Sequence, residues 1–331
     1  MLIQTQAYPR AALIGNPSDG YFGKTIAFTF ANFRAETVLY ETPELAILPS
    51  PRDSSVFAGI RDLYDDVNLY GYYGGIRLLK STIKSFYAYC LEHNLPVHDR
   101  NFTIRYSSNI PHLVGLAGSS AIITAAMRAL LQFYGVDIPK PQLANLIRAV
   151  ENRELGIAAG LQDRVAQVYQ GVVYMDFAKS LFDSRGYGRY EPIDPALLPP
   201  LYLAYRTDLS EGSEVFHNNI RERFDRGEPD VLAAMRFWAD LTDQARDAIA
   251  RRDARKLAEL QNAGFDRRTQ LYKLSEGNLR MIAAARATGA SAAFTGSGGA
   301  IAGVYTDDAM FQRLQETFAP QQVVVFRPQI V

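Results

Sequence analysis

The sequence PHLVGLAGSSA, residues 111–121, separates a strand-like run that ends near Ile110 from an apolar stretch that reaches Tyr134. Its two glycines allow a tight turn and a close approach of a ligand to the backbone, and Ser119 can cap the helix that follows. The first N–H groups of that helix lack backbone partners and carry the positive end of the helix dipole. The stretch therefore predicts a phosphate-binding loop. The alternative is a loop that only caps a core helix.

The composition is that of an ordinary globular protein. A length of 331 residues predicts about two domains, and 48% hydrophobic residues suffice for a large core. Thirty-five basic residues balance thirty-five acidic ones, which disfavours nucleic acid or an anionic membrane as a partner. The sequence does not indicate an oligomeric state.

Several other classes of site are disfavoured. Cys90 is the single cysteine and lies in an apolar helical pattern, so we expect a buried thiol and a reducing, cytoplasmic location. No apolar run has the length of a signal peptide or of a membrane span. The histidines lack metal-ligand spacing, and no serine-hydrolase elbow is present. The four histidines are His93, His98, His112 and His217.

The pattern of elements changes along the chain. Short β-like runs between Ala11 and Leu48 predict a mostly antiparallel sheet, and residues 49–70 are polar and irregular. The second half is helical and ends in strand-like runs, so we predict two α+β domains, residues 1–200 and 201–331, with a cleft between them. Helical spacing predicts helices over residues 74–92, 119–134, 139–154, 163–169, 212–226, 230–251, 253–274 and 276–288.

A second glycine-rich loop, residues 295–300, lies between two strand-like runs near the C-terminus. A hairpin can use such a loop, but three glycines in four positions exceed what a hairpin needs. The excess indicates close approach of the backbone to another segment or to a phosphate.

A third glycine-containing segment, residues 15–20, is followed by Gly23-Lys24-Thr25 and resembles the end of a Walker A loop. The position that requires its first glycine is Ser18, and a β-rich run follows where a P-loop opens a helix. We therefore reject a P-loop NTPase. The segment is interpreted as a turn facing a ligand, with Asp19 as a hydroxyl acceptor and Lys24 as an anion partner; a solvated turn is the alternative.

A cluster of polar residues surrounds the glycine break at residues 156–160. Glu151 and Glu154 share a helix face, and Asp163 and Arg164 follow the break. A site that phosphorylates a hydroxyl needs a carboxylate for Mg²⁺, an acceptor for the hydroxyl and a nearby cation. The cluster contains all three, although a charged turn after a helix is the alternative.

Together these motifs resemble those of the GHMP kinase superfamily, over nearly the whole chain. The proline and the GL-x-SSA pattern of residues 111–121 match the central motif, residues 295–300 match the third motif, and residues 13–19 match the first. Asn16-Pro17 replaces the Glu-His pair that is common in galactokinases. The resemblance implies a two-domain α+β fold, with a β-rich α/β N-terminal ATP-binding domain, a helix-rich C-terminal domain, and the active site in the cleft.

Within the superfamily, five strings resemble the glucuronokinases, which phosphorylate glucuronic acid at the anomeric carbon. This implies a sugar 1-kinase that uses ATP and Mg²⁺. The alternatives are a GHMP kinase acting on a heptose phosphate, fucose or mevalonate, and a catalytically silent sensor of ATP and sugar. The five strings are GNPSDGYFGKTI, GYYGGIRLL, NIPHLVGLAGSSAI, ELGIAAGLQDRVAQVY and FTGSGGA, which begin at residues 15, 71, 109, 154 and 294.

The resemblance also implies roles for individual residues. Asp163 would face the acceptor hydroxyl as a base or an orienting group, beside Arg164, and Glu151 would bind Mg²⁺ with Ser119 or Ser120. A cation would meet the substrate carboxylate, with Arg164, Arg77 and Lys24 as candidates. The implied ATP-binding residues are Pro111, Gly115, Leu116, Ala117, Gly118, Ser119, Ser120, Ala121, Gly296, Ser297, Gly298 and Gly299. The implied substrate-binding residues are Asn16, Ser18, Asp19, Tyr21, Lys24, Arg77 and Gln162.

Overall fold

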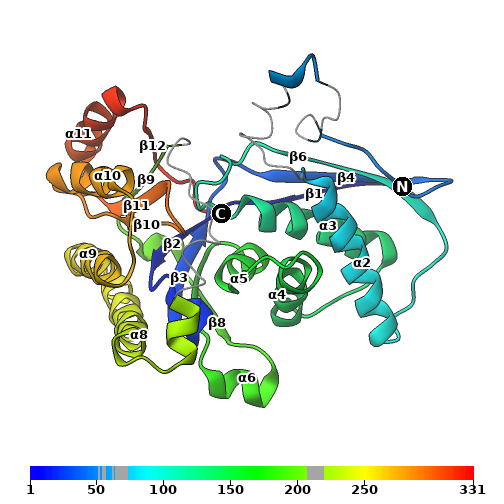
Figure 1. The fold of residues 1–331 in the computed structure, drawn as a ribbon, viewed down its shortest axis with the longest axis horizontal. Helices are drawn as coiled ribbons and strands as arrows, with labels where there is room; N and C mark the ends of the chain where they lie inside the picture. The colour runs from blue at the N-terminus through cyan, green and yellow to red at the C-terminus, as the bar shows by residue number, and fades with distance from the viewer. Residues whose placement is uncertain (51–52, 54–56, 62, 64–73, 207–219) are drawn as a thin grey trace. The chain divides into compact units, whose positions relative to one another are not determined.

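The computed structural model divides the chain into two compact units, each built from separate stretches of sequence (Figure 1). Unit 1 comprises Met1–Pro9, Phe33–His112 and Gly118–Ala159. Unit 2 comprises Arg10–Asn32, Leu113–Ala117 and Gly160–Val331. The structure describes residues 1–50, 53, 57–61, 63, 74–206 and 220–331.

Unit 1 contains a four-stranded sheet with the strand order β1-β4-β6-β5. The strands are β1 (Leu2–Ala7), β4 (Ala35–Thr42), β5 (Ala46–Ile47) and β6 (Asn101–Ser108). Its pairs are antiparallel except for β5 with β6. Buried and exposed side chains alternate along β1, which is the pattern of a strand with one face in the core.

The helices of unit 1 are α2 (Ile76–Glu92), α3 (Gly118–Tyr134) and α4 (Lys140–Ala149), and a π-helical turn, η3 (Val150–Glu154), extends α4. Helix α3 lies against the sheet, where Thr5 Oγ1 of β1 donates a 2.6 Å hydrogen bond to a carbonyl of α3 (Figure 1). Such π-turns occur frequently at functional sites, and η3 contains Glu151.

Unit 2 contains two antiparallel sheets, the first with the order β2-β3-β7-β8. A short 3₁₀ turn, η1 (Ser18–Tyr21), connects its first two strands, and α5 (Gln162–Tyr169) precedes β7. The strands are β2 (Arg10–Ile14), β3 (Lys24–Thr29), β7 (Val172–Asp176) and β8 (Arg189–Ile193), with α6 (Lys179–Arg185) between the last two. The segment after residue 23 is thus a strand, as the rejection of a P-loop requires.

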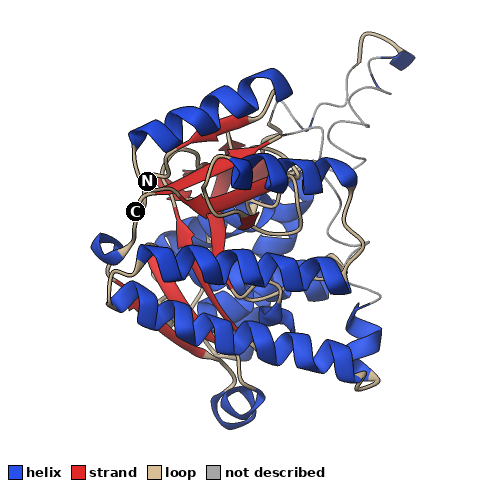
Figure 2. Cartoon of the chain, turned by 90° about the vertical axis from the view of Figure 1, so that its left-hand side faces the viewer, coloured by secondary structure: helices blue, strands red, loops and turns tan. Residues whose placement is uncertain are grey.

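The second sheet of unit 2 has the order β10-β11-β9-β12. The chain combines helices with mostly antiparallel strands, as in an α+β fold (Figure 2). The strands are β9 (Leu201–Tyr205), β10 (Ala293–Phe294), β11 (Ala300–Val304) and β12 (Val324–Phe326). The helices are α8 (Pro229–Ala250), α9 (Ala254–Leu271), α10 (Glu276–Ala287) and α11 (Asp308–Phe318), with 3₁₀ turns η4 (Pro195–Leu197) and η6 (Ala319–Gln321).

Most predicted helices are confirmed, with ends that differ by a few residues. The prediction of a single N-terminal sheet was wrong, because β2 and β3 belong to one sheet and β4 and β5 belong to another. Sequence patterns did not predict β1, β8, α6 or α11. Residues 212–219 of one predicted helix, most of the irregular segment 49–70 and His217 lie outside the described residues.

The division into compact units does not follow the predicted boundary near Pro200, since each unit takes stretches from the first half of the chain. The domains 1–200 and 201–331 remain a prediction. Among the described residues, no helix has the length and apolar character that crossing a bilayer requires.

Candidate active site

Arg10, the first residue of β2, is the centre of the hydrogen-bond network in unit 2. Its Nε donates to Asp163 Oδ1 at 2.6 Å, and its Nη1 donates to the carbonyl oxygens of Gly115, at 3.0 Å, and Thr295. The residue is only 5% exposed. One guanidinium thus connects the predicted catalytic aspartate with both glycine-rich loops. Sequence analysis missed Arg10, although a charged residue that opens an otherwise apolar strand was a usable signal.

Asp163 lies in the first turn of α5 and is held by a second guanidinium. Arg164 Nη1 donates to Asp163 Oδ2 at 3.0 Å and to the carbonyl oxygen of Gly160 at 3.0 Å. Arg164 is 4% exposed. The structure therefore brings together the two residues predicted to be catalytic, and each oxygen of the aspartate accepts a charge-assisted hydrogen bond.

Asp19, on η1, lies against the backbone that leads into α5. Its Oδ2 accepts a 3.3 Å hydrogen bond from the backbone N–H of Gln162. A Cβ added to Gly160 would lie 2.1 Å from the same oxygen, so only glycine permits this approach. Burial, and secondarily the negative charge of Asp163, raises the pKa of Asp19 from 3.8 to about 6.

Gln162 has a buried side chain whose polar atoms are unsatisfied. The residue is 1% exposed, and neither Oε1 nor Nε2 of its amide has a hydrogen-bond partner among the residues that the structure describes. Leaving a buried amide without partners costs free energy, so each such group requires an explanation. A hydroxyl of a bound ligand would be a suitable partner, and substrate binding by Gln162 stays a prediction.

Two other predicted substrate residues fix the turn before β3. Ser18 Oγ accepts from the Lys24 backbone N–H at 3.1 Å and donates to the Lys24 carbonyl oxygen at 2.9 Å. Lys24 Nζ forms a 2.5 Å ion pair with Asp243 on α8. Both side chains therefore have structural partners in unit 2. Arg77, a third predicted residue, belongs to α2 of unit 1.

Asn16 and Tyr21 contact arginines that sequence analysis missed. Asn16 Oδ1 accepts a 2.8 Å hydrogen bond from Arg268 Nη1 on α9, and Arg268 is 3% exposed. The guanidinium of Arg221 lies 4.4 Å from the centroid of the Tyr21 ring, in a cation–π contact. No local pattern distinguishes Arg268 or Arg221 from the other arginines of the helical half.

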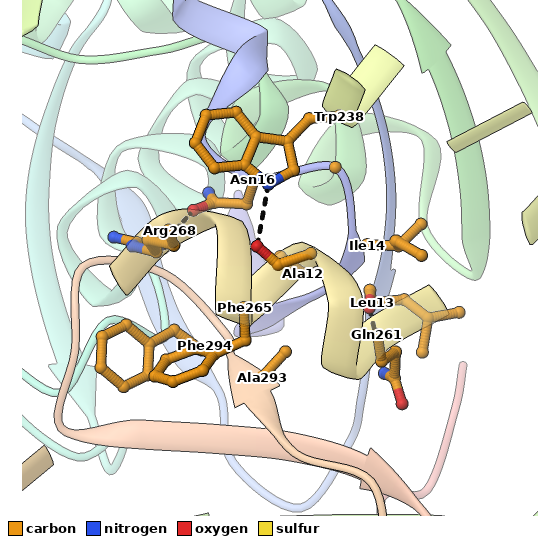
Figure 3. Close-up of a pocket in the computed structure, with 12 residues that line it drawn as sticks. Ala12, Leu13, Ile14, Asn16, Trp238, Gln261, Phe265, Arg268, Ala293 and Phe294 are labelled. Atoms are coloured by element: carbon orange, nitrogen blue, oxygen red, sulfur yellow. Dashed lines mark hydrogen bonds between the residues drawn. The ribbon is translucent and has the colours of Figure 1, made fainter. Parts of the chain in front are cut away.

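Asn16 and Arg268 also line a small cavity between β2, α8, α9 and β10 (Figure 3). Its volume is about 20 Å³, which is room for one water molecule and far less than a sugar needs. Figure 3 shows the Asn16 side chain between Trp238 and Arg268, with a dashed hydrogen bond to the latter. The cavity is thus a gap in the packing beside the loop that carries Asp19, and we do not assign the substrate to it.

The two glycine-rich loops pack against each other in unit 2. A Cβ on Gly296 would lie 2.5 Å from the Gly115 carbonyl oxygen, and a Cβ on Gly115 would lie 3.0 Å from the Gly298 carbonyl oxygen. Gly115 also has a φ of +71°, which disfavours other residues. Close approach to another chain segment, one of the two explanations for the excess of glycine, is therefore confirmed.

The remaining residues of the central motif help to hold that loop. The Leu116 carbonyl oxygen accepts from the Arg10 backbone N–H at 3.2 Å, and the Ala117 carbonyl oxygen accepts from Gln167 Nε2 at 2.9 Å. Pro111 is partly buried, and Ala121, inside α3, is fully buried. Their role in ATP binding stays a prediction.

In unit 1, Ser119 and Glu151 are brought together. Ser119 Oγ donates a 2.8 Å hydrogen bond to Glu151 Oε1, and Glu151, on the π-turn η3, is 2% exposed. The expectation that Ser119 caps α3 was wrong, because the helix begins at Gly118 and the hydroxyl is directed to Glu151. Ser120 is fully buried in the first turn of α3, and Glu154 pairs with Lys84 at the surface.

Comparison with known sequences identifies the GHMP kinases N terminal domain at residues 77–171. Glucuronokinase 1 of Arabidopsis thaliana is 42% identical over 304 residues, which cover 90% of this chain and 84% of that protein. Probable glucuronokinase 2 of the same plant is 43% identical over 307 residues, or 91% of this chain and 83% of that protein.

Solved structures support the same fold. The Methanococcus jannaschii mevalonate kinase has a TM-score of 0.72 at 16% identity, covering 100% of this chain and 98% of that one. The Lactococcus lactis galactokinase complexed with galactose has a TM-score of 0.73 at 15% identity, covering 99% and 93%. At this identity the likeness establishes the fold alone. The sequence relatives go further, and they show that the chain belongs to the glucuronokinases within the GHMP kinase superfamily.

Proposed function

We propose that this chain transfers the γ-phosphoryl group of ATP to the anomeric hydroxyl of glucuronic acid. The observation that carries the proposal is the pair Arg10–Asp163, supported by Arg164, on a chain 42% and 43% identical to two glucuronokinases over most of its length. Phosphoryl transfer depends mainly on positioning and on charge stabilisation, and this cluster supplies both.

In the proposed reaction, the proton of the anomeric hydroxyl passes to Asp163 and the anomeric oxygen attacks the γ-phosphorus. The bond from that phosphorus to the β-phosphate oxygen breaks, which leaves ADP. Asp163 faces the hydroxyl, and its orientation is fixed because Arg10 and Arg164 each hold one of its oxygens. The buried guanidiniums add positive charge beside the transferring group. Asp19 and the unsatisfied amide of Gln162 hold the sugar hydroxyls.

The ATP phosphates are assigned to the backbone N–H groups from Gly115 to Ser120. The first turn of α3 begins at Gly118 and carries the positive end of the dipole of a helix of 17 residues, which favours a bound anion. Residues Gly296–Gly299 pack against Gly115 and so shape the loop that precedes α3. We propose that they also line the nucleotide site.

The residues of unit 1 fit a Mg²⁺ ion. A buried carboxylate and a hydroxyl 2.8 Å apart, Glu151 Oε1 and Ser119 Oγ, are hard oxygen donors of the kind that Mg²⁺ selects. When bound, the ion would neutralise charge on the phosphates. Ser119 or Ser120 and Glu151 would hold it, and the 2% exposure of Glu151 is consistent with a carboxylate fixed for this purpose.

The substrate carboxylate requires a cation. Among the candidates, Lys24 forms an ion pair with Asp243, and Arg164 forms one with Asp163. The third candidate, Arg77, lies on α2 of unit 1. Arg268 is a fourth candidate, since it contacts Asn16 on the segment that leads to Asp19.

We also propose a cytoplasmic location, where ATP and reducing conditions are available.

A panel of acceptors incubated with MgATP, and followed by a coupled ADP assay, tests the proposal. We expect turnover of glucuronate and little turnover of glucose, fucose, mevalonate or a heptose phosphate. Phosphorylation of the neutral sugars alone would exclude a glucuronate kinase and favour another GHMP activity. Binding of ATP and sugar without ADP formation would favour a silent sensor.

A further inference from the structure

We propose that Gln167 on α5 is a positioning residue for the phosphate-binding loop. It holds the peptide that joins Ala117 to Gly118 so that the N–H group of this peptide is directed at the ATP phosphates. The inference rests on the proposed kinase activity and deepens it, because it names a residue that sets the affinity for the phosphates and not for the acceptor. No sequence motif had assigned a role to Gln167.

Gln167 is a polar side chain that is 0% exposed. Its Nε2 donates a 2.9 Å hydrogen bond to the carbonyl oxygen of Ala117. Gln167 follows Asp163 by about one helical turn, so the two side chains lie on the same face of α5. One short helix thus carries both the predicted catalytic aspartate and a donor that holds the phosphate-binding loop.

Ala117 has a backbone conformation that is uncommon for a residue with a Cβ. Its φ is +60°, and Gly115, two residues earlier, has a φ of +71°. Turns with such angles can direct successive N–H groups to one side, where they form an anion-binding nest. An alanine keeps this conformation only where its surroundings hold it. The hydrogen bond from Gln167 holds the Ala117 carbonyl in that conformation.

Three consecutive carbonyl oxygens of the loop accept hydrogen bonds from β2 and α5. Arg10 donates to Gly115 through Nη1 at 3.0 Å and to Leu116 through its backbone N–H at 3.2 Å, and Gln167 donates to Ala117. In a trans peptide, the C=O group of one residue and the N–H group of the next point in opposite directions. The N–H groups that follow these carbonyls are therefore directed away from β2 and α5. Arg10 orients the first two peptides, and Gln167 orients the third.

The third peptide contains the N–H group of Gly118, the first residue of α3. This group carries part of the positive end of the helix dipole, so its direction affects a charged ligand more than an uncharged one. Loss of the Gln167 amide would release the Ala117 carbonyl and allow the peptide to rotate. We therefore expect weaker binding of phosphates and little change in the binding of adenosine, which has none.

Calorimetry with ADP, a non-hydrolysable ATP analogue and adenosine, all in the presence of Mg²⁺, tests the inference in the wild type, Gln167→Met and Gln261→Met. Methionine keeps the length of the side chain and removes its donor. Gln261 is the matched control, because it is 1% exposed and its Nε2 donates to the carbonyl oxygen of Leu13, on β2, at 3.0 Å. Thermal unfolding of the unliganded variants measures the loss of stability that both substitutions cause.

We expect Gln167→Met to bind ADP and the ATP analogue about tenfold more weakly than the wild type, and adenosine within about twofold. Gln261→Met should lose stability but keep its ADP affinity within about twofold. If Gln167→Met does not fold, hydrogen exchange of the wild type decides. ADP should protect the backbone amides of residues 116–118, and adenosine should not.

Any of three results would overturn the inference: unchanged ADP affinity in Gln167→Met, equal losses for ADP and adenosine in that variant, or an equal loss of ADP affinity in Gln261→Met. Exchange at residues 116–118 that ADP does not slow would also overturn it. A wild type that binds neither ADP nor the ATP analogue would instead refute the proposed function itself, so the two failures are distinguishable.

Discussion

Two aspartates of unit 2, Asp163 on α5 and Asp19 on η1, illustrate how surroundings determine the role of a carboxylate. Asp163 is held at both oxygens by guanidiniums, whereas Asp19 contacts backbone N–H groups in a partly buried position, where desolvation raises its pKa to about 6. The first arrangement fixes the orientation of a carboxylate through two ion pairs, and the second holds a carboxylate against the backbone that leads into α5. The predictions below test this difference, from the largest expected effect to the smallest.

Asp163→Asn removes the charge that Arg10 and Arg164 hold. We expect kcat to fall by about a hundredfold or more, with ATP affinity nearly unchanged, because the amide keeps the shape but not the charge. A coupled assay measures turnover, and calorimetry measures nucleotide binding. A fully active variant would remove Asp163 from the reaction.

Arg10→Lys keeps a positive charge but loses the forked donor that reaches Asp163, Gly115 and Thr295. We expect kcat to fall by about thirtyfold, since Asp163 loses a fixed orientation. Arg255→Lys is the matched control, because Arg255 is exposed and pairs with Glu259 at the surface. Equal rates in the two variants would mean that Arg10 does not position Asp163.

Glu151→Gln tests the metal site of unit 1. We expect the Mg²⁺ concentration that gives half-maximal rate to rise by about tenfold, since a charged ligand becomes neutral. Glu154→Gln is the control, three residues along on the same π-turn and paired with Lys84. An unchanged Mg²⁺ dependence would assign the ion to other residues.

Gly160→Ala places a methyl group against Asp19 Oδ2, at 2.1 Å in the present geometry. Displacement of Asp19 should raise the KM for the sugar about fivefold, with a smaller change in the KM for ATP. Gly264→Ala on α9 is the control, because its nearest contacts would be an ordinary 3.9 Å. If both variants behave as wild type, Asp19 does not need this position.

Sequence reasoning predicted the local features of the fold well. Helix α3 follows the glycine motif, and the break before Asp163 separates η3 from α5, because spacing and glycines determine such features within a few residues. The turn before β3 was also predicted, and its role in substrate binding stays a prediction. These parts of the site depend on short-range pattern.

The features that were missed depend on distant contacts. Arg10 reaches partners 105, 153 and 285 residues away, and Arg268 reaches Asn16 across 252 residues. Nothing adjacent to either arginine indicates its partners. Likewise, the assignment of β2 and β4 to different sheets is decided by which strands pair, and not by the strand pattern itself.

The most direct test of the central claim is phosphorus NMR of the product formed from glucuronate and MgATP. An anomeric phosphate gives a phosphorus signal that is coupled to the anomeric proton, and we expect this signal to grow in step with ADP. A phosphorus signal coupled to any other sugar proton, or ADP accompanied only by inorganic phosphate, would contradict a glucuronate 1-kinase.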